Sequence, residues 1–346
     1  MTILEQPALP GIFCPIETDI HPAVETIENH SIEWLRAGRF LDDPHQGHAL
    51  IATKSAEFMA RMAPHGRADR LQIASDWAYW GFAFDDRFDR GPLSKDLVGF
   101  VSYATRIVRV LEAPGSTLLE TDPLVSGLID ISARFTECVT PVQHRRWVQA
   151  HRAWLFGVCA EMGGPTTPSV DEYLAIRINN AAGEIVTVIT ELVNQYEPPA
   201  AELELPRVRA LTEMARVLAA LDNDLYSHPK TKALNETNQH DLPTVIAARH
   251  ACGPDEALAR AIRLRDRIMC RFLAAGTQTT GLSTDTRRYL QGLRHVIRGN
   301  LDWALDVERY RVGGRSVADC FTITDTPIDS SPHPPGISSI DWWWRV

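Results

Sequence analysis

The chain has 346 residues, of which 45% are hydrophobic and 23% are charged, as is typical of a globular protein with a substantial core. Its formal net charge of −9 argues against binding to nucleic acid or to an anionic membrane surface, so an anionic substrate would need metal ions or local basic residues. The spacing of the six cysteines fits neither a zinc site nor a disulfide framework, which indicates reduced thiols in a cytoplasmic protein. The sequence predicts neither a signal peptide nor a membrane-inserted helix.

Helical periodicity dominates the chain. Residues 1–20 carry three prolines and a glycine and are expected to form an extended N-terminal strap. From residue 21 to 311, apolar residues recur at helical spacing, Pro or Gly marks the breaks, and no alternation typical of strands is found. We therefore predict an all-α fold in which 21–311 form one helical domain. After a first helix that begins near His21, the expected helices cover 48–62, 70–88, 95–112, 122–138, 141–160, 171–195, 205–227, 254–276 and 283–311.

The last segment, 312–346, differs in composition, because it is rich in Gly and Pro and ends near three adjacent tryptophans, Trp342–Trp344. Three consecutive side chains cannot share one face of a helix. The segment either orders over the mouth of a binding site as a lid or packs on the outside of the bundle. We favour packing on the outside.

The most informative motif is an aspartate-rich pentapeptide that contains Asp85, Asp86 and Asp89 and follows an apolar, aromatic run at 77–84. Carboxylates crowded beside apolar side chains are costly unless cations neutralise them. Asp85 and Asp89 are four residues apart, so on a helix they point the same way. Two carboxylates on one face suit Mg²⁺, a hard cation that takes oxygen ligands and often binds substrate phosphates. The alternative is an acidic helix end that is exposed to solvent.

A second group of oxygen-bearing side chains follows much later in the chain. Asn223 and Ser227 are also four residues apart, so both side-chain oxygens face one way on a helix. Together with a carboxylate they can hold one Mg²⁺ and leave positions for phosphate oxygens. Taken alone, the group is more simply interpreted as a helix end, because Asn, Asp and Ser are common in caps and turns.

The two motifs together resemble those of the bacterial class I terpene synthases, also called terpene cyclases. That family carries an aspartate-rich DDxxD-type motif and, much later, the motif Asn-Asp-x-x-Ser-x-x-x-Glu. The first is complete at 85–89, and the second matches at Asn223, Asp224 and Ser227. The resemblance covers about residues 14–315 and implies a class I terpenoid synthase-like bundle around a central apolar cavity.

Other residues typical of the family occur at the expected positions in the sequence. The diphosphate-sensing arginine of the family matches Arg177, which lies 46 positions before Asn223. The family's Arg-Tyr pair matches Arg309 and Tyr310, and the preceding sequence at 300–303, Asn-Leu-Asp-Trp, is also similar to the family.

The resemblance implies a Mg²⁺-dependent enzyme. In this family three Mg²⁺ ions and basic side chains bind the diphosphate of a linear isoprenyl substrate. Ionisation is followed by cyclisation to a terpene hydrocarbon or alcohol, with release of diphosphate. Carried over to this sequence, the expected metal ligands are Asp85, Asp89, Asn223, Ser227 and Thr231. The expected hydrogen-bond donors to the diphosphate are Arg177, Lys230, Arg309 and Tyr310.

The resemblance also implies a helix break after the sensor arginine, at 180–183. There, Asn180 would link Arg177 to the carbonyl of Ala181, which aids ionisation. The alternative is a plain helix in which Gly183 allows close packing.

The rest of the pocket is expected to be apolar and aromatic, because ring faces stabilise cations without acting as nucleophiles. Phe82 lies one helical turn before Asp85 on the same face and is the first expected aromatic wall; Trp303 is the second. For Trp77, Trp80 and Trp154 the sequence favours ordinary core positions.

Substrate length is weakly indicated by small residues near the aspartate-rich motif. Ala78, Gly81 and Ala83 leave room for a longer chain. This favours geranylgeranyl diphosphate over farnesyl diphosphate, with geranyl diphosphate third.

One position departs from the family pattern. The family's glutamate falls at Thr231, whose hydroxyl can ligate a metal weakly but brings no negative charge. Pro229 removes an amide donor and disfavours helix before it, so the helix is expected to kink or end just after Ser227. We therefore expect a working site that demands more Mg²⁺. A degenerate relative that binds diphosphate without turnover is the alternative.

Two other classes of protein share part of this pattern. A chain-elongating prenyltransferase shares the fold and the Mg²⁺ chemistry but would need a second aspartate-rich motif in place of 223–231. A non-enzymatic helical interaction protein would explain the helices but not the coincidence of all these motifs. The expected partner is therefore an isoprenyl diphosphate, with neither nucleic acid nor membrane insertion, and a homodimer is left open.

Overall fold

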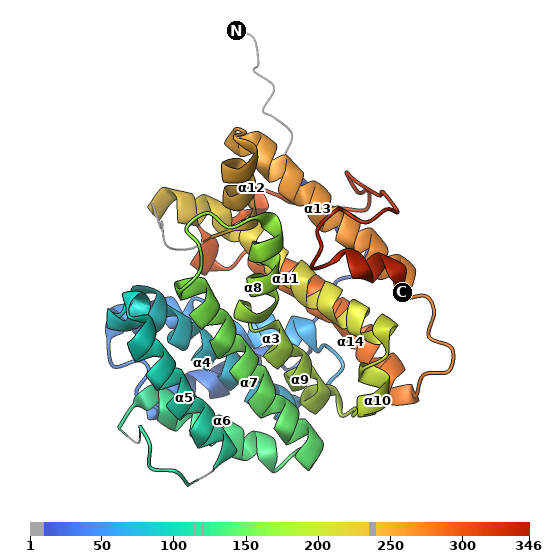
Figure 1. Cartoon of the computed structure of the whole chain (residues 1–346). Coiled ribbons are helices and arrows are strands. Elements are labelled where there is room, and N and C mark those ends of the chain that lie inside the picture. Colours follow the sequence, from blue (N-terminus) through green and yellow to red (C-terminus); the bar gives the residue numbers. More distant parts are fainter. Residues whose placement is uncertain (1–9, 114, 120, 235–239) are drawn as a thin grey trace.

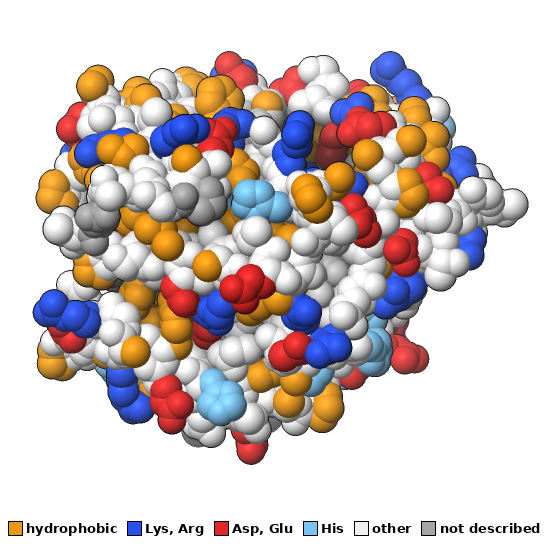
Figure 2. All heavy atoms as spheres, turned by 90° about the horizontal axis from the view of Figure 1, so that it is seen from below, with side chains coloured by type: hydrophobic (Ala, Val, Ile, Leu, Met, Phe, Trp, Pro, Cys, Tyr) orange, Lys and Arg blue, Asp and Glu red, His pale blue; other side chains and the backbone are white. Residues whose placement is uncertain are grey.

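The computed structural model describes residues 10–113, 115–119, 121–234 and 240–346, except for the side chains at 89–90 and 232–234. Helices make up almost all of its regular structure and pack into one bundle (Figure 1). This confirms the predicted all-α fold. Within the described residues, no helix is both long and apolar enough to cross a membrane. Figure 2 shows one face of the molecule, on which acidic, basic and apolar side chains are interspersed.

The helices occupy most of the chain between residues 24 and 304 and are joined by short connections. They are α1 (Val24–Ala37), α2 (Pro44–Ile51), α3 (Ser55–Met62), α4 (Ala68–Arg90), α5 (Leu97–Glu112), α6 (Pro123–Thr136), α7 (Pro141–Met162), α8 (Val170–Asn180), α9 (Gly183–Asn194), α10 (Ala200–Leu203), α11 (Pro206–Leu234), α12 (Leu242–His250), α13 (Pro254–Ala275) and α14 (Thr284–Ala304). Short 3₁₀ helices are η1 (Pro92–Lys95), η2 (Glu308–Tyr310), η3 (Val317–Asp319) and η4 (Asp341–Arg345).

Polar caps fix where the helices that carry the site begin. Thr140 and Ser169 each accept a hydrogen bond from the backbone of the third helical residue, and Gln143 and Glu172 reach back to complete two capping boxes at the starts of α7 and α8. The start of α8 is thereby fixed two turns before Arg177.

Two clusters of buried apolar side chains meet at the centre of the bundle. One cluster involves α11, α13 and α14 and contains Leu221 and Phe272. The other involves α4, α7 and α9 and contains Trp80 and Trp147. Phe58 of α3 packs against both. The candidate site lies where the two clusters meet.

Several helix boundaries differ from the predicted ones. The expected helix 48–62 is divided into α2 and α3, because Lys54 adopts a left-handed backbone conformation with φ of 48°. The expected helix 283–311 ends at Ala304. Helix α12 was not predicted; Asp241 caps its start, and the Asp241 carboxylate accepts from the amide of Thr244.

Two very short strands join the N-terminal strap to the C-terminal tail. β1 (Gly11–Phe13) pairs in parallel with β2 (Thr322–Thr324), and Gly11 lies opposite Thr322. These two strands were not predicted from the sequence. Three residues are too few for alternation to be visible in a sequence.

A fully buried ion pair holds this sheet on the bundle. Arg265 of α13 donates to both carboxylate oxygens of Asp222 of α11, at 2.7 and 3.1 Å, and also to the carbonyl of Phe13. The neighbouring Asp266 accepts from the amides of Phe13 at 3.2 Å and Ile328 at 2.9 Å. Strap, tail, α11 and α13 are therefore connected through one charged cluster.

The C-terminal tail packs along α11 and α13 (Figure 1, red against orange). Trp343 is fully buried, and its indole N–H donates to Glu213 of α11 at 3.0 Å. Arg271 of α13 donates to the carbonyl of Trp343 at 2.9 Å, while the guanidinium of Arg209 lies 5.4 Å from the centre of the Trp342 ring. In this arrangement the tail covers α11 and α13, and its described residues do not line the cavity of the candidate site.

Asp222→Ala is expected to lower the free energy of unfolding by about 3–5 kcal/mol, because it leaves the Arg265 guanidinium buried without a counter-charge. Denaturant unfolding of the variant beside the wild type measures the loss. The double variant Asp222→Leu with Arg265→Met removes both charges and should recover most of the lost free energy of unfolding. A single variant as stable as the wild type would contradict this role for the pair.

Candidate active site

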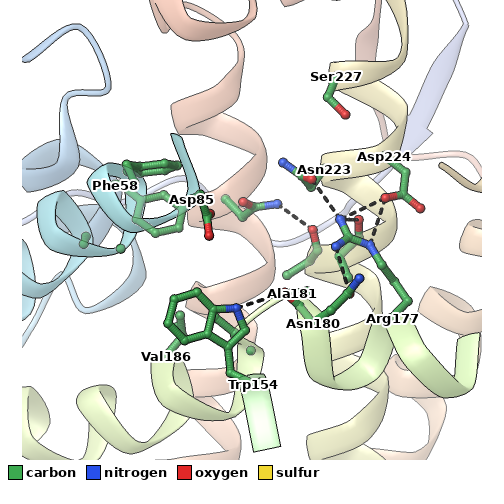
Figure 3. A pocket seen from close by; sticks show the side chains of 18 of the residues that line it. Phe58, Asp85, Trp154, Arg177, Asn180, Ala181, Val186, Asn223, Asp224 and Ser227 are labelled. Atoms are coloured by element: carbon green, nitrogen blue, oxygen red, sulfur yellow. Dashed lines mark hydrogen bonds and ion pairs between the residues drawn. The ribbon is translucent and has the colours of Figure 1, made fainter. Parts of the chain in front are cut away.

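A cavity of about 300 Å³ lies between α4, α11 and α14, with further lining residues from α3, α7, α8 and α9. Along α4 and α11 its lining changes from largely apolar to largely polar towards the C-terminal end of each helix. Figure 3 shows the two sides facing one another, with Asp85 on one and Asn223 and Ser227 on the other. A concave apolar site with a few convergent polar groups is the usual form of a small-molecule site.

The α4 side presents the aspartate-rich motif to the cavity. Asp85 and Asp86 both line it, one and two residues beyond the aromatic run that forms the adjoining wall. The side chain of Asp89 lies outside the described part of the structure, so its expected role as a metal ligand stays a prediction.

The α11 side presents the second motif. Asn223, Ser227 and Thr231 follow at intervals of four residues on one helix, and all three line the cavity. Position 231 therefore faces the same space as the two residues that match the family motif, which places its hydroxyl on the expected side.

The expected end of this helix just after Ser227 is wrong. Helix α11 continues through Pro229 to Leu234, although a proline removes one hydrogen bond from a helix. Tyr226, which is 2% exposed, anchors the turn before the proline in the core. In the turn itself, His228 donates to the carboxylate of Asp241 at 2.8 Å. Tertiary contacts therefore hold the segment helical despite the proline.

Arg177 joins α8 to α11 through hydrogen bonds to three side chains. Its guanidinium donates to Asp224 at 3.0 Å, to Asn223 at 2.8 Å and to Asn180 at 3.2 Å (Figure 3). The carboxylate of Asp224 also accepts from the Tyr173 hydroxyl. The sensor arginine and the second motif thus form one connected polar cluster.

The charges in this cluster stabilise one another. Burial by itself lowers the pKa of Arg177, but the Asp224 carboxylate outweighs it and the pKa lies above its ordinary value. Burial raises the pKa of Asp224 to about 6, although Arg177 opposes the shift. At pH 7 the arginine is charged and most of the Asp224 population is ionised.

The expected helix 171–195 is interrupted directly after the sensor arginine. Helix α8 ends at Asn180, Ala182 takes a left-handed backbone conformation with φ of 56°, and α9 begins at Gly183. The plain-helix alternative is therefore wrong. Asn180, Ala181, Ala182 and Gly183 all line the cavity, so the backbone at the break faces it.

Aromatic rings form the wall between α3, α4 and α14. The rings of Phe82 and Trp303 are stacked with centroids 5.7 Å apart, and Phe58 lies 4.6 Å from Trp303. The indole N–H of Trp303 donates to the carbonyl of Thr53 at 2.8 Å, which fixes the ring in place. Both predicted wall residues lie at the cavity, and Phe58 is a third that the sequence did not indicate.

Two of the tryptophans expected in the ordinary core also contribute to the wall. Trp77 and Trp154 belong to the buried core, as expected, and both also line the cavity. Trp80 is a core residue, since it is fully buried and its indole N–H donates to the carbonyl of Leu124 at 2.7 Å. Trp77 lies one turn from Gly81 on the cavity face of α4, and Trp80 points away from it.

The small residues of α4 do not all face the cavity. Ala78 and Gly81 line it, and a Cβ atom added at Gly81 would have no other heavy atom within 4 Å. Ala83 packs against the buried apolar residues instead, so its expected contribution to pocket length is wrong.

Arg309 of η2 lines the cavity and is held by the aspartate-rich motif. Its two terminal nitrogens donate to the two oxygens of Asp86, at 3.0 and 2.9 Å, and its guanidinium carbon lies 4.8 Å from the centre of the Phe82 ring. Burial lowers the pKa of Arg309, but Asp86 outweighs it and the pKa lies above its ordinary value. The pair keeps a permanent cation at the polar end of the cavity.

The other expected diphosphate donors lie close by. The Tyr310 hydroxyl accepts a hydrogen bond from the side-chain amide of Asn223 at 3.1 Å. The Lys230 ammonium lies 5.9 Å from the centre of the Tyr310 ring. All four of these expected donors line the one cavity: Arg177, Lys230, Arg309 and Tyr310.

The described donors fit a hard divalent cation. Asp85 supplies charge, and Asn223, Ser227 and Thr231 supply neutral oxygens. The side-chain oxygen of Asn223 accepts from Arg177, and a carbonyl oxygen has a second lone pair that can bind a cation. No cluster of three or more His, Cys, Asp or Glu occurs among the residues that the structure describes; three of the five expected ligands are Asn, Ser and Thr, which such a cluster does not include.

Sequence reasoning gave no role to three acids that organise the site. Asp86 pairs with Arg309 and Asp224 with Arg177, although both acids stand inside the recognised motifs. Glu161 accepts from the side-chain amide of Asn180 at 2.8 Å and lines the cavity. Because consecutive residues on a helix point in different directions, the sequence indicates that Asp86 points away from Asp85. Nothing in the sequence indicates a role for Glu161, a single glutamate near the end of α7.

The fold and this arrangement define a class I terpene synthase. Residues 76–271 match the family described as terpene synthase family 2, C-terminal metal binding, a match that begins before the aspartate-rich motif and ends after the second motif. The chain belongs to this family and is a terpene cyclase. The family description also implies a bound divalent metal ion.

Similar proteins match almost the whole chain. Spiroviolene synthase of Streptomyces violens is 41% identical, over 97% of this chain and 96% of that protein. Phomopsene synthase of Allokutzneria albata is 36% identical, over 97% and 96% respectively. The crystal structure of the SVS_A2 protein from ancestral sequence reconstruction superposes with a TM-score of 0.87 at 41% identity, over 98% of this chain and 99% of that one.

Phe82→Ala is expected to shift the products towards early-quenched, less cyclised hydrocarbons, because it removes a ring face from the cavity wall. Gas chromatography–mass spectrometry of the extracted products measures the shift. Phe82→Tyr keeps the ring and serves as the control, with a profile close to that of the wild type. An unaltered profile in the alanine variant would place Phe82 outside the reacting part of the cavity.

Proposed function

We propose that this protein ionises a linear isoprenyl diphosphate in a Mg²⁺-dependent reaction, cyclises the resulting cation to a terpene hydrocarbon or alcohol, and releases diphosphate. The observation that carries the proposal is the convergence on one cavity of the α4 and α11 motifs with two largely buried arginines, Arg177 and Arg309. Asp85, Asn223 and Ser227 lie at the same polar end as Arg177 and Arg309.

The polar end suits the leaving group. When the allylic C–O bond breaks, both electrons stay with the diphosphate oxygen, and negative charge grows there. Mg²⁺ held by Asp85, Asn223, Ser227 and Thr231, with three ions as in the family, would supply Lewis-acid stabilisation of that charge. Donors for the diphosphate oxygens are then Arg177, Lys230, Arg309 and Tyr310. Each arginine has five N–H groups, so Arg309 can donate to the substrate while it stays paired with Asp86.

The helix break between α8 and α9 is suitably placed to assist ionisation of the substrate, the first step of the proposed reaction. Arg177 contacts both Asn223 of the metal motif and Asn180 at the break. Diphosphate bound at the arginine is thus connected, through Asn180, to the carbonyl of Ala181 next to the cavity. We assign that carbonyl, as in the family, to the stabilisation of the cation as it forms.

The apolar end suits the carbocation. Phe82 and Trp303 present ring faces, which stabilise positive charge without forming a bond to it. Apolar walls also exclude water, which would otherwise quench the cation. Ala78 and Gly81 leave open space along α4, and we therefore propose geranylgeranyl diphosphate as the first substrate and farnesyl diphosphate as the second.

Incubation of the purified protein with geranyl, farnesyl and geranylgeranyl diphosphate, each with and without Mg²⁺, tests the proposal. We expect a cyclic product that appears only with Mg²⁺ and in highest yield from geranylgeranyl diphosphate. Absence of product from every substrate, even at high Mg²⁺, would overturn the proposal in favour of a relative that binds diphosphate without turnover.

Asp85→Ala and Asn223→Ala are each expected to reduce turnover to background, because each removes a ligand from one half of the metal site. Product formation and thermal unfolding are measured on the same preparations. Asp306→Ala is the matched control, since this acid is 76% exposed and does not line the cavity. Retained turnover in either site variant would contradict the assignment of the metal ligands.

Thr231→Glu is expected to lower the Mg²⁺ concentration needed for half-maximal rate, because it restores the carboxylate that the family motif carries at this position. The measurement is a Mg²⁺ titration of the initial rate. Thr231→Gln, of similar size but uncharged, is the control and should give no such decrease. An unchanged or higher requirement in the glutamate variant would mean that position 231 does not face the metal.

A further inference from the structure

His151 of α7 lies at the centre of a group of tryptophans. The side chain is fully buried, and its ring centre lies 4.2 to 6.5 Å from those of four tryptophans: Trp77, Trp80, Trp147 and Trp154. A buried, titratable ring in an apolar core needs hydrogen-bond partners for both nitrogens. The hydrogen-bond partners of the two nitrogens therefore determine the tautomer of His151.

The hydrogen bonds define one tautomer of His151. Its Nδ1 atom lies 2.8 Å from the carbonyl oxygen of Trp147, which can only accept, so Nδ1 carries the proton. Its Nε2 atom lies 3.2 Å from the indole nitrogen of Trp77, which can only donate, so Nε2 presents a lone pair. Burial lowers the pKa of His151 to about 4, in agreement with a neutral ring at pH 7.

Trp77 is the member of this group that both lines the cavity and forms a hydrogen bond with His151. It lines the cavity, whereas His151 does not, so the hydrogen bond draws the indole N–H away from the cavity space. Trp77 precedes Asp85 by eight residues on α4, which places it about 12 Å further along the helix. In the proposed function it would therefore lie nearer the hydrocarbon part of the substrate than the diphosphate.

The orientation of the ring has an electrostatic consequence. The face of an indole ring is electron-rich and attracts a cation, whereas its N–H edge is positive and repels one. The other described tryptophans of the cavity wall, Trp154 and Trp303, donate to backbone carbonyls of Asn180 and Thr53, at 3.1 and 2.8 Å. Only for Trp77, among the three, does a side chain supply the acceptor.

We propose that His151 is a positioning residue for the cyclisation: as a neutral acceptor it holds the indole edge of Trp77 out of the cavity and fixes how that ring meets the late carbocations. The inference rests on the proposed function, because it assigns the residue to carbocation chemistry in that cavity. It predicts an effect on the distribution of products and little effect on ionisation.

His151→Asn and His151→Gln provide a matched pair of variants. An asparagine amide reaches the level of Nδ1 but falls short of Trp77, whereas a glutamine amide reaches the level of Nε2 and can offer its oxygen to the indole. We expect His151→Asn to raise the ratio of side products to main product about three- to tenfold, the range of a cation–π contact. The rate of substrate consumption should stay near that of the wild type, and His151→Gln should restore the wild-type distribution.

Ser132→Ala is the control for general loosening of the tryptophan group. Ser132 accepts from the indole N–H of Trp147 at 3.1 Å, and Trp147 does not line the cavity. We expect its product distribution to match that of the wild type. An unchanged distribution in His151→Asn, or an equal change in Ser132→Ala, would overturn the proposal, since a structural role alone lowers thermal stability without selective change in products.

A further measurement on the wild type tests the proposal without depending on the His151 variants to fold. Hydrogen exchange of the Trp77 indole N–H, assigned by its loss in Trp77→Phe, should be slow at pH 7. Exchange as fast as that of an exposed indole would overturn the proposal. A wild type that gives no cyclic product would refute the proposed function instead, while the exchange rate would still show whether His151 holds Trp77.

Discussion

The buried pair of Arg177 and Asp224 is the interaction on which the rest of the site depends. Two charges taken out of water are costly unless further hydrogen bonds compensate them. Here Tyr173 and the amide of Leu242 donate to the acid, while Asn180 and Asn223 accept from the arginine. The pair thereby fixes the end of α8 against α11 and the start of α12. The register of α11, and with it the direction of its oxygen ligands, follows from this contact.

The cavity has a polar end and an apolar end, which lie at different positions along α4 and α11. On α4 and α11, polar side chains gather near the C-terminal ends, and apolar or aromatic ones lie further back. Arg309 closes the polar end by pairing with Asp86 and resting on the ring of Phe82. One aromatic ring thus contacts both the anion-binding group and the hydrocarbon space. A leaving anion and a migrating cation can in this way be stabilised in neighbouring regions of one cavity.

The features that could be predicted are those that local sequence patterns determine. Helical periodicity predicts most helices, and the spacing of four residues places Asn223 and Ser227 on one face of their helix. What the sequence could not supply are contacts between distant segments. The helix continues past Pro229 because Tyr226 is buried and His228 meets Asp241, neither of which is visible in a local pattern. Glu161 and Phe58 belong to the site only because α7 packs beside α8 and α3 packs beside α4.

The pairing of the two short strands sets an order of events during protein synthesis. Gly11 leaves the ribosome early, but its partner Thr322 follows about 310 residues later. At 5–20 residues per second, roughly 15 to 60 s separate the two. During that time Ile12 and Phe13, which are 2% and 6% exposed in the finished fold, cannot take their final places on the sheet. The helices can assemble first, and the strap packs onto α13 only when the tail has been synthesised. A ribosome that stalls near the end of the message therefore leaves an apolar segment uncovered. Chaperones and proteases can then bind that segment.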